Sequence, residues 1–468
     1  MTNNKIKIKL SELKLKLNTY KIEPGLRVLL DMLIFLLEVV LSKSKKNSKN
    51  SSIPPSQDPN REKKKKSGNR KTGGQKGHKG FTLEIDPNPT DIISLKIDRR
   101  TIPHNVTYIN AEPEIRQVKD FEVKIIITEY QAEVLIDDKG SRYVADFPGQ
   151  VTKAIQYGSG IKANAVYMNC FQMSSLDRIE ENFFDQLNIK LSDSSVYNFS
   201  LELHQKLIDW DEVIKAKLIT EELLHADETG LNVNGEKYWL HTLCNKKLTW
   251  FYMHKNRGKE AMDEMGVLPL FKGYLCHDHW KAYFMYFCFH ILCNAHHLRE
   301  LTYIEEEEMQ KWAKKMKDFL LALNKEVIEK GGKLSDKRQK TVIKIYQQIL
   351  KNGEKECPIN LVRKGKRGKT KQSKSRNLLD RFKDYETEIL SFMKNTLIPF
   401  TNNQGENDLR MTKVKLKISG CFRSAIGAQI FARIRGFINT CRKNDINVSW
   451  ALKEVFNGNL ESIIKMVF

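Results

Sequence analysis

The stretch between residues 220 and 303 constrains the fold more than any other part of this chain. Its aliphatic and aromatic residues gather in runs of strand length, each bounded by polar residues. One further run, "GKEAMDEMGVL", has the length and spacing of a helix. In chain order the strand-like runs are "LLHADETGL", "KYWLHTLCN" and "LTWFYMHKN" before the helix, then "GYLCHDHW" and "CFHILCNA" after it. We therefore expect a sheet built from these five runs.

The order of these elements, three strands, a helix and a strand, then further helices around a fifth strand, is that of an α/β ribonuclease-H-like fold. That fold has a mixed five-stranded sheet flanked by helices, and its first and fourth strands are neighbours. Asp227 ends the first run and Asp278 ends the fourth. The two carboxylates should therefore converge, although 51 residues separate them.

Glu406 completes a candidate acid triad. It lies in a polar stretch that begins a helix, and Arg410 and Lys413 follow on the same helical face. Three carboxylates held close together repel one another unless a cation lies between them, and hard oxygen ligands suit Mg²⁺ or Mn²⁺. Two such ions about 4 Å apart promote phosphodiester chemistry, and the two basic residues would hold DNA phosphates. The alternative is that the acids are surface or capping residues without a common site.

The net charge of +22 is concentrated in two segments. Residues 61–80 carry nine cations and one acid, and residues 363–376 carry eight cations and no acid, so together they supply 16 of the 22 charges. Clustered cations attract nucleic acid because each neutralised phosphate releases counterions, although a solvated linker, a ribosomal protein or a membrane-surface protein has a similar pattern. The predicted DNA-binding residues of the first segment are Lys63, Lys64, Lys65, Lys66, Arg70, Lys71, Lys76 and Lys79.

Composition and periodicity divide the chain into six segments. The first has leucines at helical spacing and is a candidate for oligomerisation. The fourth has the outline of a helix-turn-helix, with a break at residues 188–191 and a cap at Ser192 or Asp193, although such hairpins also occur in ordinary cores. The expected segments are 1–45 (helical), 46–82 (basic flexible linker), 83–158 (β-rich), 159–215 (helical, DNA-binding), 216–440 (catalytic, with a helical insertion at about 304–398) and 441–468 (helical).

Further motifs lie in order along nearly the whole chain. They include "SSIPPSQD", "GGQKGHKG", "YGSGIKANAVYM", "HADETGLNVNGEKYWLH", "RGKEAMDEMGVLP", "HDHWKAYF", "CNAHHLREL", "NNQGENDLRMTKVKLKISGCFRS" and "GFINTCRKNDINVSWALKEVF". In this order and spacing they resemble the insertion-sequence-66 family of transposases, which belongs to the DDE group. The resemblance implies that Asp227, Asp278 and Glu406 are the catalytic Asp, Asp and Glu, and that a helical insertion fills the 128 residues between the last two.

The function that the resemblance implies is that of a DNA transposase. It would bind the terminal inverted repeats of its element, cleave DNA with two Mg²⁺ or Mn²⁺ ions, and join the freed 3′-OH to target DNA. A homo-oligomer is expected because two DNA ends must be held together, and small accessory proteins are possible partners. The alternatives are a nuclease of the same fold that cuts without joining, and a DNA-binding relative without catalytic activity.

The sequence departs from the family pattern in two places. Relatives usually have "NNxAER" at the glutamate, whereas Gly405 precedes it and Asn407 follows it here, so we expect a weaker DNA contact while the metal-binding acid remains. Many relatives carry paired CxxC motifs that form a zinc ribbon ahead of "YGSG", but no cysteine precedes Cys170. We therefore expect no zinc in the N-terminal region. Either the hairpins persist there without metal or this copy is damaged.

Other polar residues near the candidate triad are expected to be structural. Cys293 and His296 have half of a zinc-site spacing, but no second pair is evident, so packing is favoured. His277 and His279 flank Asp278 and should point away from it in a strand, and Glu228 should face away from Asp227.

Two features bear on location. The opening residues lack the apolar core of a signal peptide, and the most apolar run, Val28 to Leu41, is too short to span a bilayer. The eight cysteines follow no disulfide pattern. We expect a bacterial cytoplasmic protein associated with the nucleoid and no membrane partner.

Overall fold

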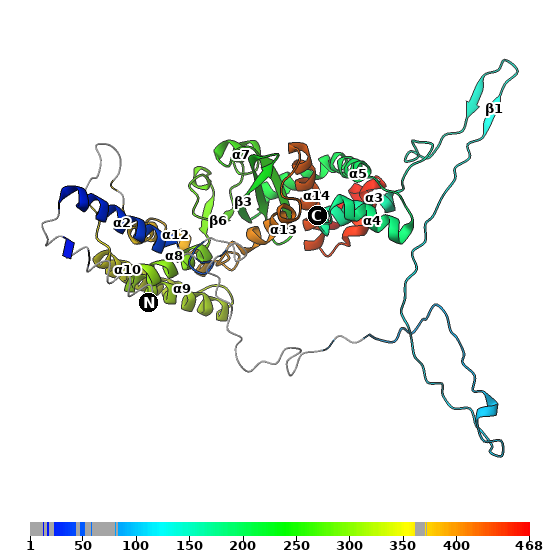
Figure 1. Ribbon diagram of the computed structural model, residues 1–468, viewed down its shortest axis with the longest axis horizontal. Coiled ribbons are helices and arrows are strands. Elements are labelled where there is room, and N and C mark those ends of the chain that lie inside the picture. Colours follow the sequence, from blue (N-terminus) through cyan, green and yellow to red (C-terminus); the bar gives the residue numbers. More distant parts are fainter. Residues whose placement is uncertain are drawn as a thin grey trace. The chain divides into compact units, whose positions relative to one another are not determined.

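Figure 1 shows the computed structural model of the chain. It describes residues 13, 16–17, 23–43, 47–51, 58, 80, 83–360, 370 and 372–468 (Figure 1). The chain divides into two compact units, of which one comprises residues 1–61 and 132–468 and the other comprises residues 62–131. The predicted basic arm from Lys63 to Lys79 lies outside the described residues.

A five-stranded sheet forms the centre of the first unit. Its strands are β3 (Leu223–Val233), β4 (Glu236–Cys244), β5 (Thr249–His254), β6 (Tyr274–His277) and β7 (Phe289–Leu292), and their order in the sheet is β5-β4-β3-β6-β7. The pairs β3–β4 and β4–β5 are antiparallel, whereas β3–β6 and β6–β7 are parallel. The prediction of a mixed five-stranded sheet flanked by helices is therefore confirmed.

The turn between β3 and β4 follows directly from the sequence. Only Asn234 and Gly235 separate the two strands, and both have a positive φ, of 49° and 86°. An Asn-Gly pair in this conformation makes the tight turn whose twist matches that of the flanking strands. The hairpin fixes the register in which Asp227 lies opposite Thr242.

One hydrophobic core joins the sheet to helices from both ends of the unit. It includes α3 (Ser159–Val166), α6 (Ile208–Thr220), α14 (Ala425–Lys443), α15 (Val448–Phe456) and α16 (Leu460–Val467). Helix α14 packs on β5, and Gly436 permits this approach because a Cβ there would lie 3.3 Å from the Thr249 carbonyl oxygen. The ring of Trp210 on α6 meets Phe437 on α14 edge-on, with ring centroids 5.0 Å apart.

The helix-turn-helix outline between residues 176 and 206 is present. Helix α4 (Leu176–Leu187) ends at Asn188, whose left-handed conformation (φ 51°) ends a helix without a glycine. Helix α5 (Asp193–Lys206) begins with Ser192, whose hydroxyl accepts a hydrogen bond from the Ser195 N–H. The predicted break and cap are therefore confirmed, and the inner face of α5 belongs to the core of the unit.

A second core is formed mainly by the helices that lie, in chain order, between β7 and α13 (Asn403–Ser419). It is built by α8 (Asn294–Glu307), α9 (Lys311–Glu329), α10 (Asp336–Glu356), α11 (Lys374–Asp384) and α12 (Glu386–Ile389). Their buried apolar faces close around Trp312 and Tyr346, and Cys276, Ile291 and Leu292 of the strands join the same core. The segment between the second and third candidate acids thus folds as a helical body attached to the sheet.

Residues 83–158 contain much less strand than we expected. In the second unit the described residues form one short helical turn, η1 (Arg99–Thr101), and in the first unit β1 (Val134–Ile136) pairs with β2 (Arg142–Val144). The run "FEVKIIITEYQ" has strand-forming residues, yet Ile126 and Ile127 are 84% and 90% exposed. A strand needs a partner and a covering layer, and the described residues of this unit supply neither.

Helix α2 (Pro24–Lys43) is the described helix of the N-terminal segment. Ile34 is buried, whereas Leu26, Leu29, Leu33 and Leu36 are each at least half exposed. Among the residues that the structure describes, none of the helices combines the length and apolar character that a bilayer span requires.

Candidate active site

Asp227 and Asp278 lie at the carboxyl end of the parallel pair β3–β6. The two strands pair only from Leu223 to His225 on β3, and Asp227 follows two residues later. Asp278 comes directly after β6, and its Oδ1 accepts a hydrogen bond of 3.0 Å from the Trp280 N–H. We had expected Asp227 to end its strand, but it does not. β3 continues to Val233 because its pairing with β4 extends beyond the acid.

Asn402 fixes the start of α13 against β3. Its side-chain amide donates to the Ala226 carbonyl (2.8 Å), and its Oδ1 accepts from His225 Nδ1 (2.8 Å). Its backbone N–H donates to the Cys293 sulfur (3.1 Å). Asn402 is buried, so water does not compete for these hydrogen bonds. The first turn of α13, which carries Glu406, is thereby held next to the residue that precedes Asp227.

Gly405 and Asp408 set how closely α13 approaches the sheet. A Cβ on Gly405 would lie 3.3 Å from the Cβ of Asp227 and 3.3 Å from the Asn402 amide nitrogen, so any larger residue is crowded there. Asp408, one turn further along, accepts bonds from the Thr249 hydroxyl (2.8 Å) and from Lys443 Nζ (2.6 Å). The departure at Gly405 from the family pattern therefore lies at the contact between two candidate catalytic elements.

Asp227 interacts electrostatically with the other two candidate acids. Burial raises the pKa of Asp227, and the charges of Glu228, Asp278 and Glu406 raise it further, while a hydrogen bond from the Glu228 N–H lowers it, with a result of about 8. A carboxyl with so high a pKa has no adequate cationic partner in the protein. The charges of Asp278 and Glu406 thus act on Asp227, although among the described residues the ligand atoms of the three carboxylates do not all lie within 4.8 Å of one another. A divalent cation would relieve the repulsion.

Glu228, the neighbour of Asp227, has the opposite environment. Its side chain is 1% exposed, and it accepts a hydrogen bond of 2.8 Å from Arg257 Nε and one from the Tyr283 hydroxyl. The guanidinium of Arg257 lies over the ring of Trp280 at 4.2 Å and over that of Trp239 at 4.9 Å. Burial and the charge of Asp278 raise the pKa of Glu228 above its ordinary value, and Tyr283 and Arg257 offset part of this rise.

Sequence reasoning treated Glu228 as structural without finding its partners. The signal was available in part, since an acid in the middle of an aliphatic strand needs a cation, and "NRGKE" supplies one directly after β5. The distance in sequence, 29 residues, hid the pairing.

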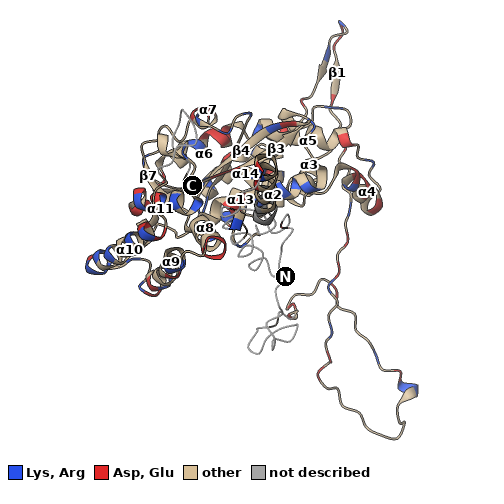
Figure 2. Cartoon of the chain, turned by 60° about the vertical axis from the view of Figure 1, so that its left-hand side comes forward, with Lys and Arg blue, Asp and Glu red and all other residues tan. Residues whose placement is uncertain are grey.

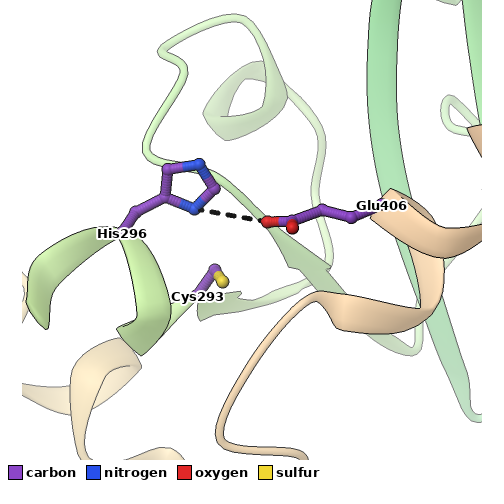
Figure 3. Close-up of side chains that lie close together, drawn as sticks. All are labelled: Cys293, His296 and Glu406. Carbon is purple, nitrogen blue, oxygen red and sulfur yellow. Dashed lines mark ion pairs between the residues drawn. The ribbon is translucent and has the colours of Figure 1, made fainter. Parts of the chain in front are cut away.

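Glu406 also has two neighbours that were not predicted. Its Oε1 lies 3.6 Å from an Arg299 nitrogen and 3.9 Å from His296 Nδ1 (Figure 3). The ligand atoms of Cys293, His296 and Glu406 all lie within 4.8 Å of one another. Packing alone, as the sequence suggested for Cys293 and His296, does not describe this arrangement. No local pattern could join them to Glu406, because 110 residues separate His296 from it.

His277 and His279 do not have the same surroundings. His277 is fully buried, its Nε2 lies 3.1 Å from His290 Nδ1, and burial lowers its pKa to about 3. His279 packs edge-on against Tyr385 with centroids 4.5 Å apart. Burial also lowers the pKa of His279, to about 4. Both imidazoles are therefore neutral near pH 7, and neither neutralises Asp278.

Arg410 and Lys413 are exposed on α13, on the face that continues from Glu406. Lys417 extends the same row by one more turn. Figure 2 shows basic and acidic residues mixed along α9 and α10, so the basic residues of these helices do not form a row without acids. The row on α13 is therefore the predicted basic feature that lies beside the acids within the described residues.

The second basic segment differs from its prediction. Residues 361–369 and 371 lie outside the described part of the chain, but Lys374 and Arg376 begin α11. Arg376 is 5% exposed and donates from Nε to Asp380 at 3.1 Å, and Lys374 lies over the Tyr303 ring at 4.2 Å. These two cations are used in folding the helical body and are not available as a flexible arm.

The sheet, its covering helices and its acid cluster define a mixed α/β protein with a candidate metal-binding site at the carboxyl end of two parallel strands. The Transposase IS66 family matches residues 154–430, which is more than half of the 468 residues. The chain belongs to this family, and the predicted family is confirmed. Residues 7–84 match a family of unknown function (DUF6444). No curated protein matches the chain. Family membership implies a transposase, an enzyme that cleaves and moves DNA.

Proposed function

We propose that this chain is a DDE transposase with a ribonuclease-H-like catalytic domain, in which Asp227, Asp278 and Glu406 bind two divalent cations. One observation carries the proposal. Asp278 and Glu406, from distant parts of the chain, act electrostatically on the buried Asp227 inside the matched region, and Asp227 has no cationic partner among the described residues. The strand order β5-β4-β3-β6-β7, with three antiparallel strands followed by two parallel ones, supports the proposed fold.

The residues of the site fit Mg²⁺ or Mn²⁺. All three ligands are carboxylates, which these hard ions prefer. Glu406 Oε1 is buried and accepts no hydrogen bond from the described residues, so an acceptor is left free for a ligand. When bound, the ions would activate the attacking oxygen and stabilise the leaving oxygen at phosphorus.

The protein supplies position and charge. Asp227 stands on β3 and Asp278 directly follows the paired strand β6, and the bonds of Asn402 hold the start of α13, which carries Glu406, against β3. Arg410 and Lys413 neutralise the phosphates of DNA that lies along α13. In cleavage, a water oxygen bonds to phosphorus and the 3′ oxygen leaves with a proton. In joining, that 3′-OH attacks a target phosphodiester, whose own 3′ oxygen leaves.

Two further regions are proposed to contact DNA, the basic arm and the exposed face of α5. The basic arm (Lys63, Lys64, Lys65, Lys66, Arg70, Lys71, Lys76 and Lys79) is proposed to hold either the element's ends or target DNA. The exposed face of α5, with Ser194, Tyr197 and Asn198, is proposed to read a major groove. Neutralising the arm should lower the salt dependence of DNA binding for every sequence, whereas changes on α5 should alter preference among sequences.

We further propose that α2 mediates a homo-oligomer that holds two DNA ends. Leu26, Leu29, Leu33 and Leu36 have the spacing of a coiled-coil seam and are 50%, 65%, 54% and 50% exposed. A second copy of α2 would cover them. Leu29→Glu with Leu33→Glu should therefore lower the mass measured by light scattering, whereas Leu321→Glu on α9, which is also exposed, should not change it.

The proposed activity is tested with purified protein and labelled DNA that carries the element's ends, in Mg²⁺ or Mn²⁺. Asp227→Asn is compared with Asp318→Asn, which removes an exposed acid of α9. We expect nicked and joined products from the parent and from Asp318→Asn, and neither product from Asp227→Asn. Nicking without joining would support the nuclease alternative. DNA binding without cleavage, even with accessory proteins of the element, would support the DNA-binding alternative.

A further inference from the structure

Cys293, His296 and Glu406 form a cluster with a chemistry different from that of the carboxylates. Cys293 is the residue that caps the start of α8, and His296 lies three residues on in its first turn, so both side chains leave the same end of the helix. Glu406 meets them from α13 (Figure 3). The three ligand atoms lie within 4.8 Å of one another, which is the spacing of ligands around one ion.

Two of the three ligand atoms lack a hydrogen bond. Glu406 Oε1 and His296 Nδ1 are both buried, and neither has a hydrogen bond to any described residue. Buried polar atoms are nearly always paired, so two unpaired atoms that face each other indicate that a ligand completes them. The third atom, the Cys293 sulfur, accepts a bond from the Asn402 N–H, and the backbone N–H groups of His296 and Ala295 also act on it. This bond holds the sulfur in place and leaves its other side toward Glu406.

The set of donors selects the kind of ion. One sulfur, one imidazole nitrogen and one carboxylate oxygen suit Zn²⁺ and its relatives, with a fourth position left for water. Mg²⁺ does not take a sulfur ligand in preference to oxygen. Binding would release the thiol proton to solvent. Arg299 opposes binding, because it lies 3.6 Å from Glu406, but its side chain is 28% exposed and can turn toward water.

We infer that Cys293, His296 and Glu406 bind a zinc-class ion, and that this ion withdraws Glu406 from Asp227 and Asp278. Glu406 is shared between a soft site and a hard site that lie side by side, and it cannot serve both at once. A zinc-class ion therefore inhibits occupation of the carboxylate cluster. The zinc-class site stands on its own geometry, and only its effect on DNA cleavage rests on the proposed function.

Cobalt reports on this site without any need for activity. The full chain is reduced, freed of metal and titrated with Co²⁺, which gives a sulfur-to-cobalt absorption band only when a cysteine is a ligand. We expect the band to saturate at one equivalent and to disappear when Zn²⁺ is added. All eight cysteines are described and unpaired, so each is a possible source of the band and controls are needed.

Four variants identify the ligands. Cys293→Ser keeps an acceptor for the Asn402 N–H and should lose the band. His296→Asn should weaken Co²⁺ binding by at least about tenfold. Cys288→Ser, at a half-buried cysteine outside the cluster, should keep the band. His254→Asn tests the other group of close ligands, His254 with Glu260 and Glu264, and should also leave the band unchanged. A parent without the band, or a band that survives in Cys293→Ser, would overturn the inference.

Competition for Glu406 is measured with Mn²⁺ in place of catalysis. The paramagnetic resonance signal of free Mn²⁺ shows how much is bound to the protein. We expect one equivalent of Zn²⁺ to release bound Mn²⁺ from the parent but not from Cys293→Ser. Equal release from both proteins, or none from the parent, would contradict sharing of Glu406. These outcomes do not depend on cleavage, so a parent that binds both ions but cuts no DNA would count against the proposed function alone.

Discussion

Asp227 and Glu228 are neighbours on one strand, and burial raises the pKa of both, yet only Glu228 has a cationic partner. Glu228 is enclosed by Arg257 and Tyr283, with tryptophan rings over the guanidinium. Asp227 has no such cation and faces two further acids. A buried acid with a cationic partner forms part of a hydrogen-bonded network. A buried acid whose neighbours are other acids is repelled by them, and a bound cation would relieve that repulsion. The contrast separates a structural acid from a candidate catalytic one without reference to sequence conservation.

The largest expected difference between the two environments is in catalysis. Asp278→Asn should lower DNA cleavage by at least about a thousandfold, because the residue belongs to a set of ligands that act as a unit. Glu228→Gln should lower it far less. The two rates are compared in the same cleavage assay, with folding checked by circular dichroism. An equal loss in both variants would mean that Glu228 belongs to the catalytic set and would remove the distinction.

The next effect is on stability. Arg257→Met leaves Glu228 buried without its cation and should lower the free energy of unfolding by about 2–3 kcal/mol, since the arginine is partly exposed and part of its charge is screened. Urea denaturation of the metal-free protein measures the change. The double variant Arg257→Met with Glu228→Gln should recover part of the loss. If the double variant is no more stable than Arg257→Met, the pair is not coupled as described.

Asp227 should give the metal-free protein a characteristic dependence on pH. Its pKa is about 8 in the folded state and 3.8 ordinarily, so between these values the folded state binds more protons than the unfolded state. Stability should therefore fall as pH rises from 4 to 8, by at most about 1.4 kcal/mol per pH unit from this group. Asp227→Asn should flatten the curve, as should saturating Mn²⁺. Identical slopes in parent and variant would show that Asp227 ionises normally.

Much of the fold follows from the sequence because the strands have strong periodic patterns. The five runs between residues 220 and 303 became β3 to β7, and the Asn-Gly turn fixed one register. Two of the candidate acids could be placed from strand order alone. The pairing of Glu228 with Arg257, and of Glu406 with His296, could not, because it depends on how side chains meet after the helices pack.

The same reasoning failed where it relied on composition. "FEVKIIITEYQ" is richer in β-branched residues than β4, but β4 lies between two strands and under helices, and the former has no such cover among the described residues. Arg376 was counted in the basic segment 363–376 that would attract nucleic acid, yet it is buried in α11 beside Asp380. Charge and propensity do not determine burial.

The smallest expected effect concerns Gly405. Gly405→Ala removes a helix-weakening glycine, which favours the variant by about 1 kcal/mol, but the new Cβ would crowd Asp227 and Asn402 at 3.3 Å. The two terms oppose each other, so the free energy of unfolding should change by less than about 1 kcal/mol. Cleavage should fall by up to about tenfold because Glu406 moves relative to Asp227. Calorimetry measures the change in the free energy of unfolding, and the cleavage assay measures the change in rate. A large loss of stability with unchanged cleavage would contradict both predictions.

The central claim is that Asp227 needs a divalent cation and Glu228 does not. Titration calorimetry with Mn²⁺ on the parent, Asp227→Asn and Glu228→Gln tests it most directly. The parent and Glu228→Gln should bind Mn²⁺ with similar affinity, and Asp227→Asn should lose at least one site. If Asp227→Asn binds Mn²⁺ as the parent does, or if Glu228→Gln is the variant that loses binding, the acids at the end of the sheet do not have the roles assigned to them.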